Sequence, residues 1–259
     1  MTRGAASAIA AVFYRDLRQR MTNVGFVFWD LLAPLAYLAL FGLGFERMMG
    51  GALLIDGRPL DYSAFLLPGV LAMVSFSVAM NTSWGFFMDK DSGIFHELLT
   101  YPITRTQLIV GKIAFNVLLS LLGAALVVAL GAAALGVPVE PRTVPLAALV
   151  VAASTAAWFF VFSAFAIAVR RMDSFNAVTS AAYVLLMFFS SMFYPLGGMP
   201  DWFRWIASAN PMTWQVDLLR WSVLGLGAPA RLLGEAAALA LFTAAGLGFA
   251  VRALDRAGD

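Results

Sequence analysis

The sequence has no cysteine and only one histidine, His96, among its 259 residues. Disulfide bridges and cysteine-ligated metal centres are therefore excluded. The zinc-protease motif HExxH begins at His96-Glu97, but position 100 is Thr100, so a zinc-dependent intramembrane protease is excluded as well. We predict no metal site, no cofactor held by this chain and no catalytic residue.

Charged residues are also scarce, at 12% of the chain, whereas hydrophobic residues make up 61%. With a mean hydropathy of +0.84, this composition excludes an ordinary soluble domain. The net charge is +2, and no basic stripe is interleaved with aromatic residues. Nucleic acid is therefore not an expected partner, whereas membrane lipid is.

Long charge-free stretches are what the sequence does contain. Residues 62–88, 113–139, 143–169 and 174–200 form four such stretches of 27 residues each. About 20 apolar residues cross a bilayer, so each stretch predicts a transmembrane helix.

Two further apolar stretches complete the predicted set of spans. Met21–Phe45 contains Asp30 as its only charge, and Leu232–Val251 contains Glu235 near its start. We therefore expect an all-α integral membrane protein with six transmembrane helices, in a single domain over residues 1–259. For Asp30, an interfacial or packing role is favoured over that of a functional intramembrane carboxylate.

The distribution of lysine and arginine predicts the orientation. With both termini in the cytoplasm, 11 of the 17 basic residues lie inside and six lie outside, as the positive-inside rule requires. The short loop at Arg170-Arg171 is the clearest single indication of this orientation. Before the first span, Ile9, Val12 and Leu17 recur at helical spacing, which predicts an amphipathic helix over residues 1–20 on the cytoplasmic surface, with its arginines toward the lipid headgroups.

The cytoplasmic loop over residues 88–105 contains a second short amphipathic pattern. A helix is predicted at Ser92–Pro102, where Pro102 closes it and Glu97 lies on its polar side. Its apolar face comprises Ile94 and Leu98, together with Phe95 and Leu99. Such a short exposed face suits a protein partner or the membrane surface.

The segment 194–229 is apolar but broken at Asn210-Pro211. Proline removes a backbone donor and disfavours helical geometry in the residue before it, so two short helices are predicted, each shorter than a bilayer is thick. We interpret the segment as a re-entrant hairpin of a transporter. Its tryptophans suit an aromatic belt or, alternatively, stacking on sugar, and Asp217 and Arg220 are spaced to form an ion pair.

Several residues near the predicted spans are candidates for a substrate path, although helix packing is the commoner role of such residues. They are Asn81, Phe188, Phe189, Met192 and Tyr194. The spans lack the midplane charges of ion-coupled carriers, and the phosphate-binding motif GxxxxGK[ST] is absent. Energy for transport must therefore come from a partner that docks on a cytoplasmic element, for which the Ser92–Pro102 helix is the best candidate.

With these motifs in this order, the chain resembles the membrane subunits of ABC-2-type ATP-binding-cassette exporters, in particular the NodJ-like, daunorubicin-resistance-like and polysaccharide-export permeases. The cytoplasmic loop is similar to the family pattern at Gly93, Glu97, Leu98, Leu99, Pro102, Ile103, Arg105, Gly111 and Lys112. The late segment is similar to a second signature at Pro195, Pro200, Trp202, Asn210-Pro211 and Arg220.

The resemblance implies a permease of a bacterial plasma (inner) membrane, expected as a homodimer above two copies of an ATPase subunit that binds ATP and Mg. Residues implied in contact with the ATPase are Gly93, Phe95, His96, Glu97, Leu98, Pro102 and Arg105. Residues implied in an outer gate are Pro200, Trp202, Asn210, Pro211, Asp217 and Arg220. A hydrophobic or amphipathic cargo such as a drug, lipid or lipid-linked glycan is expected. The alternative is a passive channel or ion-coupled carrier that uses the hairpin as a pore loop.

Overall fold

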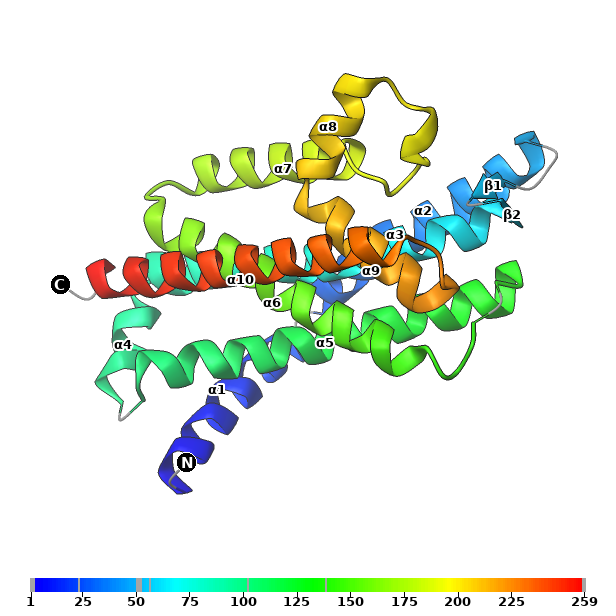
Figure 1. The fold of residues 1–259 in the computed structure, drawn as a ribbon. Coiled ribbons are helices and arrows are strands. Elements are labelled where there is room, and N and C mark those ends of the chain that lie inside the picture. The colour runs from blue at the N-terminus through cyan, green and yellow to red at the C-terminus, as the bar shows by residue number, and fades with distance from the viewer. Residues whose placement is uncertain are drawn as a thin grey trace.

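The computed structural model describes residues 3–22, 24–49, 53–55, 57–101, 103–137 and 139–257. They form a bundle of long helices with a small β-hairpin at one end (Figure 1). The elements are α1 (Arg3–Thr22), α2 (Val24–Met49), β1 (Leu53–Ile55), β2 (Arg58–Leu60), α3 (Tyr62–Asp91), α4 (Ile94–Thr100), α5 (Arg105–Leu135), α6 (Val144–Ala168), α7 (Met172–Phe188), η1 (Leu196–Gly198), α8 (Asp201–Ala209), α9 (Pro211–Leu224) and α10 (Pro229–Ala257).

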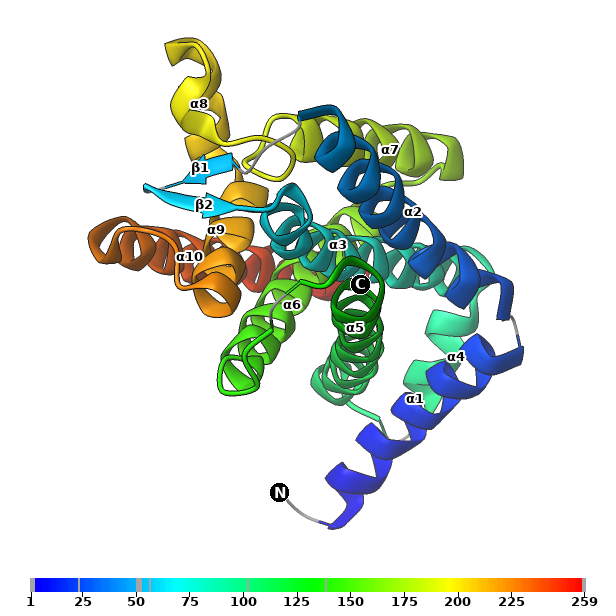
Figure 2. The same cartoon turned by 90° about the vertical axis from the view of Figure 1, so that its right-hand side faces the viewer.

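Helix α3 lies at the centre of the bundle, packed against α2, α5, α6 and α9 (Figure 2). In its most apolar 18-residue stretch, 94% of the residues are buried, compared with 22% in α10. Aromatic side chains fill the space beside it: the ring of Phe76 lies 4.8 Å from that of Trp158 and 5.1 Å from that of Phe162. Protein therefore surrounds α3 on nearly all sides, and the lipid-facing surface belongs to the other helices.

The all-α membrane class predicted from composition is confirmed. Among the described residues, four helices are long and apolar enough to cross a membrane: Tyr62–Asp91, Arg105–Leu135, Val144–Ala168 and Pro229–Ala253. They coincide with the predicted second, third, fourth and sixth spans. The predicted count of six stays a prediction.

The predicted first and fifth spans correspond to α2 and α7. In α2 the apolar stretch of the described residues is Asp30–Gly42. The charge-free stretch 174–200 predicts the fifth span, but the helix covers only its first part, because α7 ends at Phe188 after 17 residues. At about 1.5 Å per residue, α7 is about 26 Å long, slightly less than a hydrocarbon core of about 30 Å.

The two ends of the bundle differ in what they carry. Helix α4 and the end of α10 lie at one end, whereas the β-hairpin and the turn between α9 and α10 lie at the other (Figure 1). In the hairpin, Leu54 pairs with Pro59 and Ile55 with Arg58. Gly57 has a φ of 74°, which a residue with a Cβ adopts at a cost. The sequence pattern predicted no strands here.

Candidate functional site

The predicted break at Asn210-Pro211 is confirmed, and its structure explains why α7 ends where it does. Asn210 is extended, with φ −84° and ψ 121°, and Pro211 is the first residue of α9. The Asn210 Oδ1 accepts a hydrogen bond from the Met212 N–H at 2.9 Å, which caps α9. Its Nδ2 donates to the carbonyls of Leu186 and Phe189, at 2.8 and 2.7 Å. One buried side chain therefore starts one helix and satisfies the end of another.

Helix α8, which follows Pro200, lies across the bundle and projects from its side (Figure 1). It buries Phe203 against the molecule and exposes Trp202 and Trp205, at 59% and 78% of their surfaces. The exposed pair suits an aromatic belt at a membrane interface. The Nε1 of Trp214 on α9 donates to the carbonyl of Ser208 on α8 at 2.7 Å, so a hydrogen bond joins the two helices near the break.

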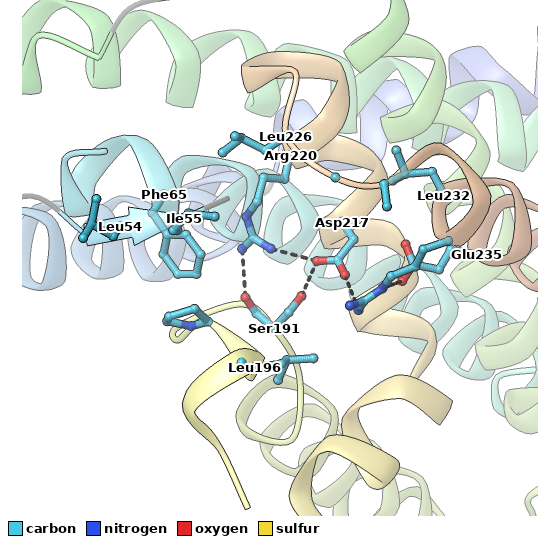
Figure 3. Close-up of a pocket in the computed structure, with 15 residues that line it drawn as sticks. Leu54, Ile55, Phe65, Ser191, Leu196, Asp217, Arg220, Leu226, Leu232 and Glu235 are labelled. Atoms are coloured by element: carbon cyan, nitrogen blue, oxygen red, sulfur yellow. Dashed lines mark hydrogen bonds and ion pairs between the residues drawn. The ribbon is translucent and has the colours of Figure 1, made fainter. Parts of the chain in front are cut away.

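Asp217 on α9 is the centre of a charged network (Figure 3). Its carboxylate accepts hydrogen bonds from Ser191 Oγ, Arg220 Nη1 and Arg231 Nη2, each at 2.7 Å. The Arg231 Nε donates to Glu235 Oε1 at 2.8 Å. The pair expected at Asp217 and Arg220 therefore forms, but as part of a group of four charges.

Arg220 also holds the chain that leaves α7. Its Nη2 donates to the carbonyl of Ser191 at 2.8 Å, and its guanidinium lies 4.2 Å from the ring centroid of Phe65 on α3. The side chain is 8% exposed, so these contacts replace water around a buried charge. Arg231 and Glu235 were missed as members of this site, although their spacing of four residues is a recognisable ion-pair signal.

A cavity of about 330 Å³ opens beside this network, at the end of the bundle that carries β1 and β2. The hairpin, η1, α9 and α10 all contribute to its wall. Its polar lining is Ser191, Asp217, Arg220, Arg231 and Glu235, and its apolar lining includes Leu54, Ile55, Phe65, Leu196, Leu226 and Leu232.

The residues predicted for a substrate path lie elsewhere and make packing contacts. Met192 is fully buried against Gly69, where a Cβ would lie 2.6 Å from the Met192 Cγ. The ring of Phe188 stacks on Phe193, and that of Phe189 on Phe203, at 5.4 and 5.5 Å.

The remaining two candidates make hydrogen bonds within the protein. The Tyr194 hydroxyl donates to the Phe188 carbonyl, and burial raises the Tyr194 pKa. The Asn81 amide donates to Asp30 on α2. Whether any of the five touches cargo stays a prediction, but none of them is among the described residues that line the 330 Å³ cavity.

At the opposite end, the predicted cytoplasmic helix is present as α4, a single short helix of seven residues. Gly93 precedes it with a φ of 78°, a conformation suited to glycine. Leu98 packs against the core, whereas Ile94, Glu97 and Tyr101 are exposed. Helix α4 therefore keeps an exposed surface that combines apolar and acidic side chains.

Two of the predicted contact residues in this region have no described side chains: Phe95 and His96. Pro102 lies outside the described residues altogether. Tyr101 before it is extended, with ψ 159°, which is the conformation that a following proline favours. Arg105 is the first residue of α5, which Thr104 and Gln107 cap reciprocally.

Helix α1, confirmed as a helix, is joined to this end of the bundle by buried charges. The Lys112 Nζ on α5 lies 3.2 Å from a carboxylate oxygen of Asp16 and 3.2 Å from one of Asp89. Arg15 pairs with Asp89 as well. All three residues of the Lys112 cluster are nearly inaccessible to solvent, and buried charges of this kind are stable only when paired.

The expectation that the arginines of α1 face lipid headgroups is wrong for two of them. Arg15 points to Asp89, and Arg20 binds Asp30, because these buried carboxylates need a counter-charge. Burial lowers the pKa of Arg20 to about 10, so it remains a cation at neutral pH. Arg18 is exposed. Asp30 is thus buried and paired, as the favoured packing role would require.

Among the described residues, no group of three or more histidine and acidic side chains is placed to hold a metal ion. Long apolar helices, a segment broken at Asn210-Pro211 and a short exposed helix are typical of a multi-pass α-helical membrane protein. The sequence pattern of the ABC-2 type transporter family matches residues 7–224. The chain belongs to this family.

Individual relatives agree with this assignment. The chain is 27% identical over 192 residues to ycf38 of Porphyra purpurea, which is named as a transport permease. It is 26% identical over 201 residues to the protein of the same name in Cyanophora paradoxa. It is 25% identical over 187 residues to the daunorubicin resistance ABC transporter permease of Streptomyces coeruleorubidus. The matches cover 71–74% of this chain but only 63–65% of each relative.

Proposed function

We propose that this chain is the membrane-spanning subunit of an ATP-driven exporter. The observation that supports it most is the combination of the family match with the exposed surface of α4. ABC-2 permeases generally work with an ATP-binding-cassette ATPase, and this sequence has no nucleotide-binding motif of its own. ATP and Mg would bind to that partner, and Ile94, Glu97 and Tyr101 would contact it.

Contacts between helices connect α4 to α8 and α9, so a displacement of α4 by the ATPase would be transmitted to them. Helix α4 follows α3 almost directly, with Leu98 packed into the core. On α9, Gln215 accepts a hydrogen bond from the Trp158 Nε1 at 2.8 Å and donates to the Ala72 carbonyl of α3 at 3.5 Å. In the proposed cycle, α3 transmits movement of the ATPase to α9, and α8–α9 act as the gate.

The assembly would contain two copies of this chain above two ATPase subunits, in a bacterial inner membrane with both termini in the cytoplasm. The exposed leucines of α5 and α10 support contact with lipid or with the second copy. The cargo would be hydrophobic or amphipathic. The daunorubicin-resistance relative supports this proposal, because its name specifies resistance to a drug.

The contact with the ATPase is tested by changing exposed residues of α4. The double variant Ile94→Ser, Glu97→Arg should abolish co-purification with the ATPase and ATP-dependent transport in vesicles, since it reverses the charge at position 97 and removes the apolar contact at position 94. Glu140→Arg is the matched control, because Glu140 is also exposed but lies in the loop between α5 and α6, at the other end. Undiminished transport in the α4 double variant would contradict the assignment. Transport without any ATPase would favour a channel or an ion-coupled carrier.

A further inference from the structure

Two residues that line the 330 Å³ cavity each have a buried hydrogen-bonding atom without a protein partner. Within the described part of the chain, Arg220 Nε and Glu235 Oε2 make no hydrogen bond. Each residue is only 8% exposed. Native proteins leave few buried polar atoms unsatisfied, so each one calls for an explanation, of which a bound water or ligand is one. In the network around Asp217, every charged group therefore has an ion-pair partner, but two of its described hydrogen-bonding atoms have no partner.

The charges of the network restrict which ligand completes it. Two guanidinium groups, of Arg220 and Arg231, face two carboxylates, of Asp217 and Glu235, so the formal charges cancel. Both oxygens of Asp217 are already occupied. A phosphate group would meet two carboxylates, and an ammonium group would meet two guanidinium groups. A hydroxyl group suits the site, because its oxygen accepts from an N–H while its proton goes to a carboxylate.

The rest of the cavity wall is aliphatic. Leu54 and Ile55 of β1 and Leu196 of η1 contribute to it, together with Leu226 near Arg220 and Leu232 near Glu235 (Figure 3). Small-molecule sites in proteins are about 300–1,000 Å³ and combine apolar walls with a few polar groups. At about 330 Å³, this cavity has room for a small headgroup and the start of an apolar chain.

We infer that this cavity, contained within one subunit, binds the uncharged, hydroxyl-bearing headgroup of an amphipathic molecule, of which an alkyl glycoside is the simplest example. The headgroup hydroxyls hydrogen-bond to the polar lining of the cavity, which includes Arg220 and Glu235, and the aliphatic wall receives the apolar part. This inference rests on the proposed function in one respect, namely that the bound molecule is taken to be the exported cargo.

The test is photolabelling of the purified full chain in lipid nanodiscs, without any ATPase. Three dodecyl probes carry the same photoreactive group and differ only in their heads: glucoside, phosphate or trimethylammonium. Labelling by the glucoside should be the strongest of the three and should map to peptides around residues 191–197 and 226–235.

Adjacent glycines of η1 supply a matched pair of variants. A Cβ at Gly197 or at Gly198 meets no other atom within 4 Å, so both positions accept a side chain, but only Gly197 lines the cavity. Gly197→Phe should reduce glucoside labelling about tenfold or more, a change of about 1.4 kcal/mol in binding. Gly198→Phe should leave it unchanged.

A separate variant tests whether the neutral charge of the network selects an uncharged headgroup. Glu235→Gln keeps the oxygen that accepts from Arg231 but gives the network a net positive charge, so labelling should shift from the glucoside toward the phosphate probe. A shift of preference between two probes on one protein sample is not produced by partial unfolding.

Equal labelling of the wild type by all three probes, or undiminished glucoside labelling of Gly197→Phe, would overturn the inference. Because the assay contains no ATPase, its failure is separable from that of the proposed function. A chain that binds its ATPase and exports, but does not bind the glucoside here, refutes this inference alone. A chain that binds the glucoside here but never an ATPase refutes the exporter assignment alone.

Discussion

Single side chains join distant parts of this molecule, and Asn210 is the clearest case. Its amide caps α9 and also binds two carbonyls at the end of α7, more than 20 residues earlier in the chain. The sequence predicts a break here because proline follows asparagine. It does not predict the contact with α7, because nothing in the local pattern specifies which carbonyls the amide reaches.

Variants at Asn210 should separate the two roles. Asn210→Ala loses the cap, which is worth about 1 kcal/mol, and removes two partly buried hydrogen bonds to carbonyls, at about 0.5–1.5 kcal/mol each. Asn210→Ser should recover about 1 kcal/mol, because a serine hydroxyl caps α9 but is too short to bind both carbonyls. Chemical unfolding of the purified protein in detergent micelles measures these differences.

Asn176→Ala is the control for this series, because Asn176 is exposed on α7. Its effect should stay within about 0.5 kcal/mol. If Asn210→Ala lowered the free energy of unfolding no more than Asn176→Ala does, the hydrogen bonds that join α7 and α9 would not contribute to stability.

At the scale of elements, the position of α1 depends on a small residue of α5. A Cβ at Gly111 would lie 2.7 Å from the Val12 Cβ, closer than such atoms approach, and 3.0 Å from the Ile9 carbonyl oxygen. Glycine at 111 and the neighbouring Lys112, which binds Asp16 and Asp89, therefore hold α1 by contact and by charge. The pair had been noted only as part of a family pattern.

Gly111→Leu should displace α1 from α5. The chain has no cysteine, so spin labels can be placed at Tyr14→Cys and Leu118→Cys, two exposed positions, without background labelling. Double electron–electron resonance should show a longer and broader distance distribution in Gly111→Leu. Gly248→Leu on α10, where a Cβ meets no atom within 4 Å, should leave the distribution unchanged. An unaltered distribution in Gly111→Leu would contradict the close packing of α1.

For the whole molecule, orientation and span count follow from which loops reach which side of the membrane. Single cysteines introduced at Leu54, Glu140 and Gly197 should react with a membrane-impermeant maleimide on intact cells. Cysteines at Ile94 and Asp173 should react only after permeabilisation. Labelling on the same side for Asp173 and Gly197 would show that α7 does not span, and reversed labelling would invert the topology.

Sequence patterning predicted the features that depend on neighbouring residues: the long apolar helices, α4, the break at Asn210 and the pairing of Asp217 with Arg220. It did not predict which buried charges meet across the bundle. Lys112 and Asp16 are 96 positions apart, so no local spacing brings them together. Composition also did not distinguish the apolar helices from one another, whereas in the structure α3 alone among the four long apolar helices of the described residues is almost fully buried.

The burial of α3 has a consequence for how freely this protein can vary. A helix that faces lipid on one side accepts many apolar substitutions there, so its tolerance to mutation rises and falls every three to four residues. In α3, 94% of the most apolar stretch is enclosed, and substitutions on every side meet packed atoms. In a saturation mutagenesis map, α3 would thus stand out as a continuous intolerant band, whereas α10 would alternate with the period of the helix.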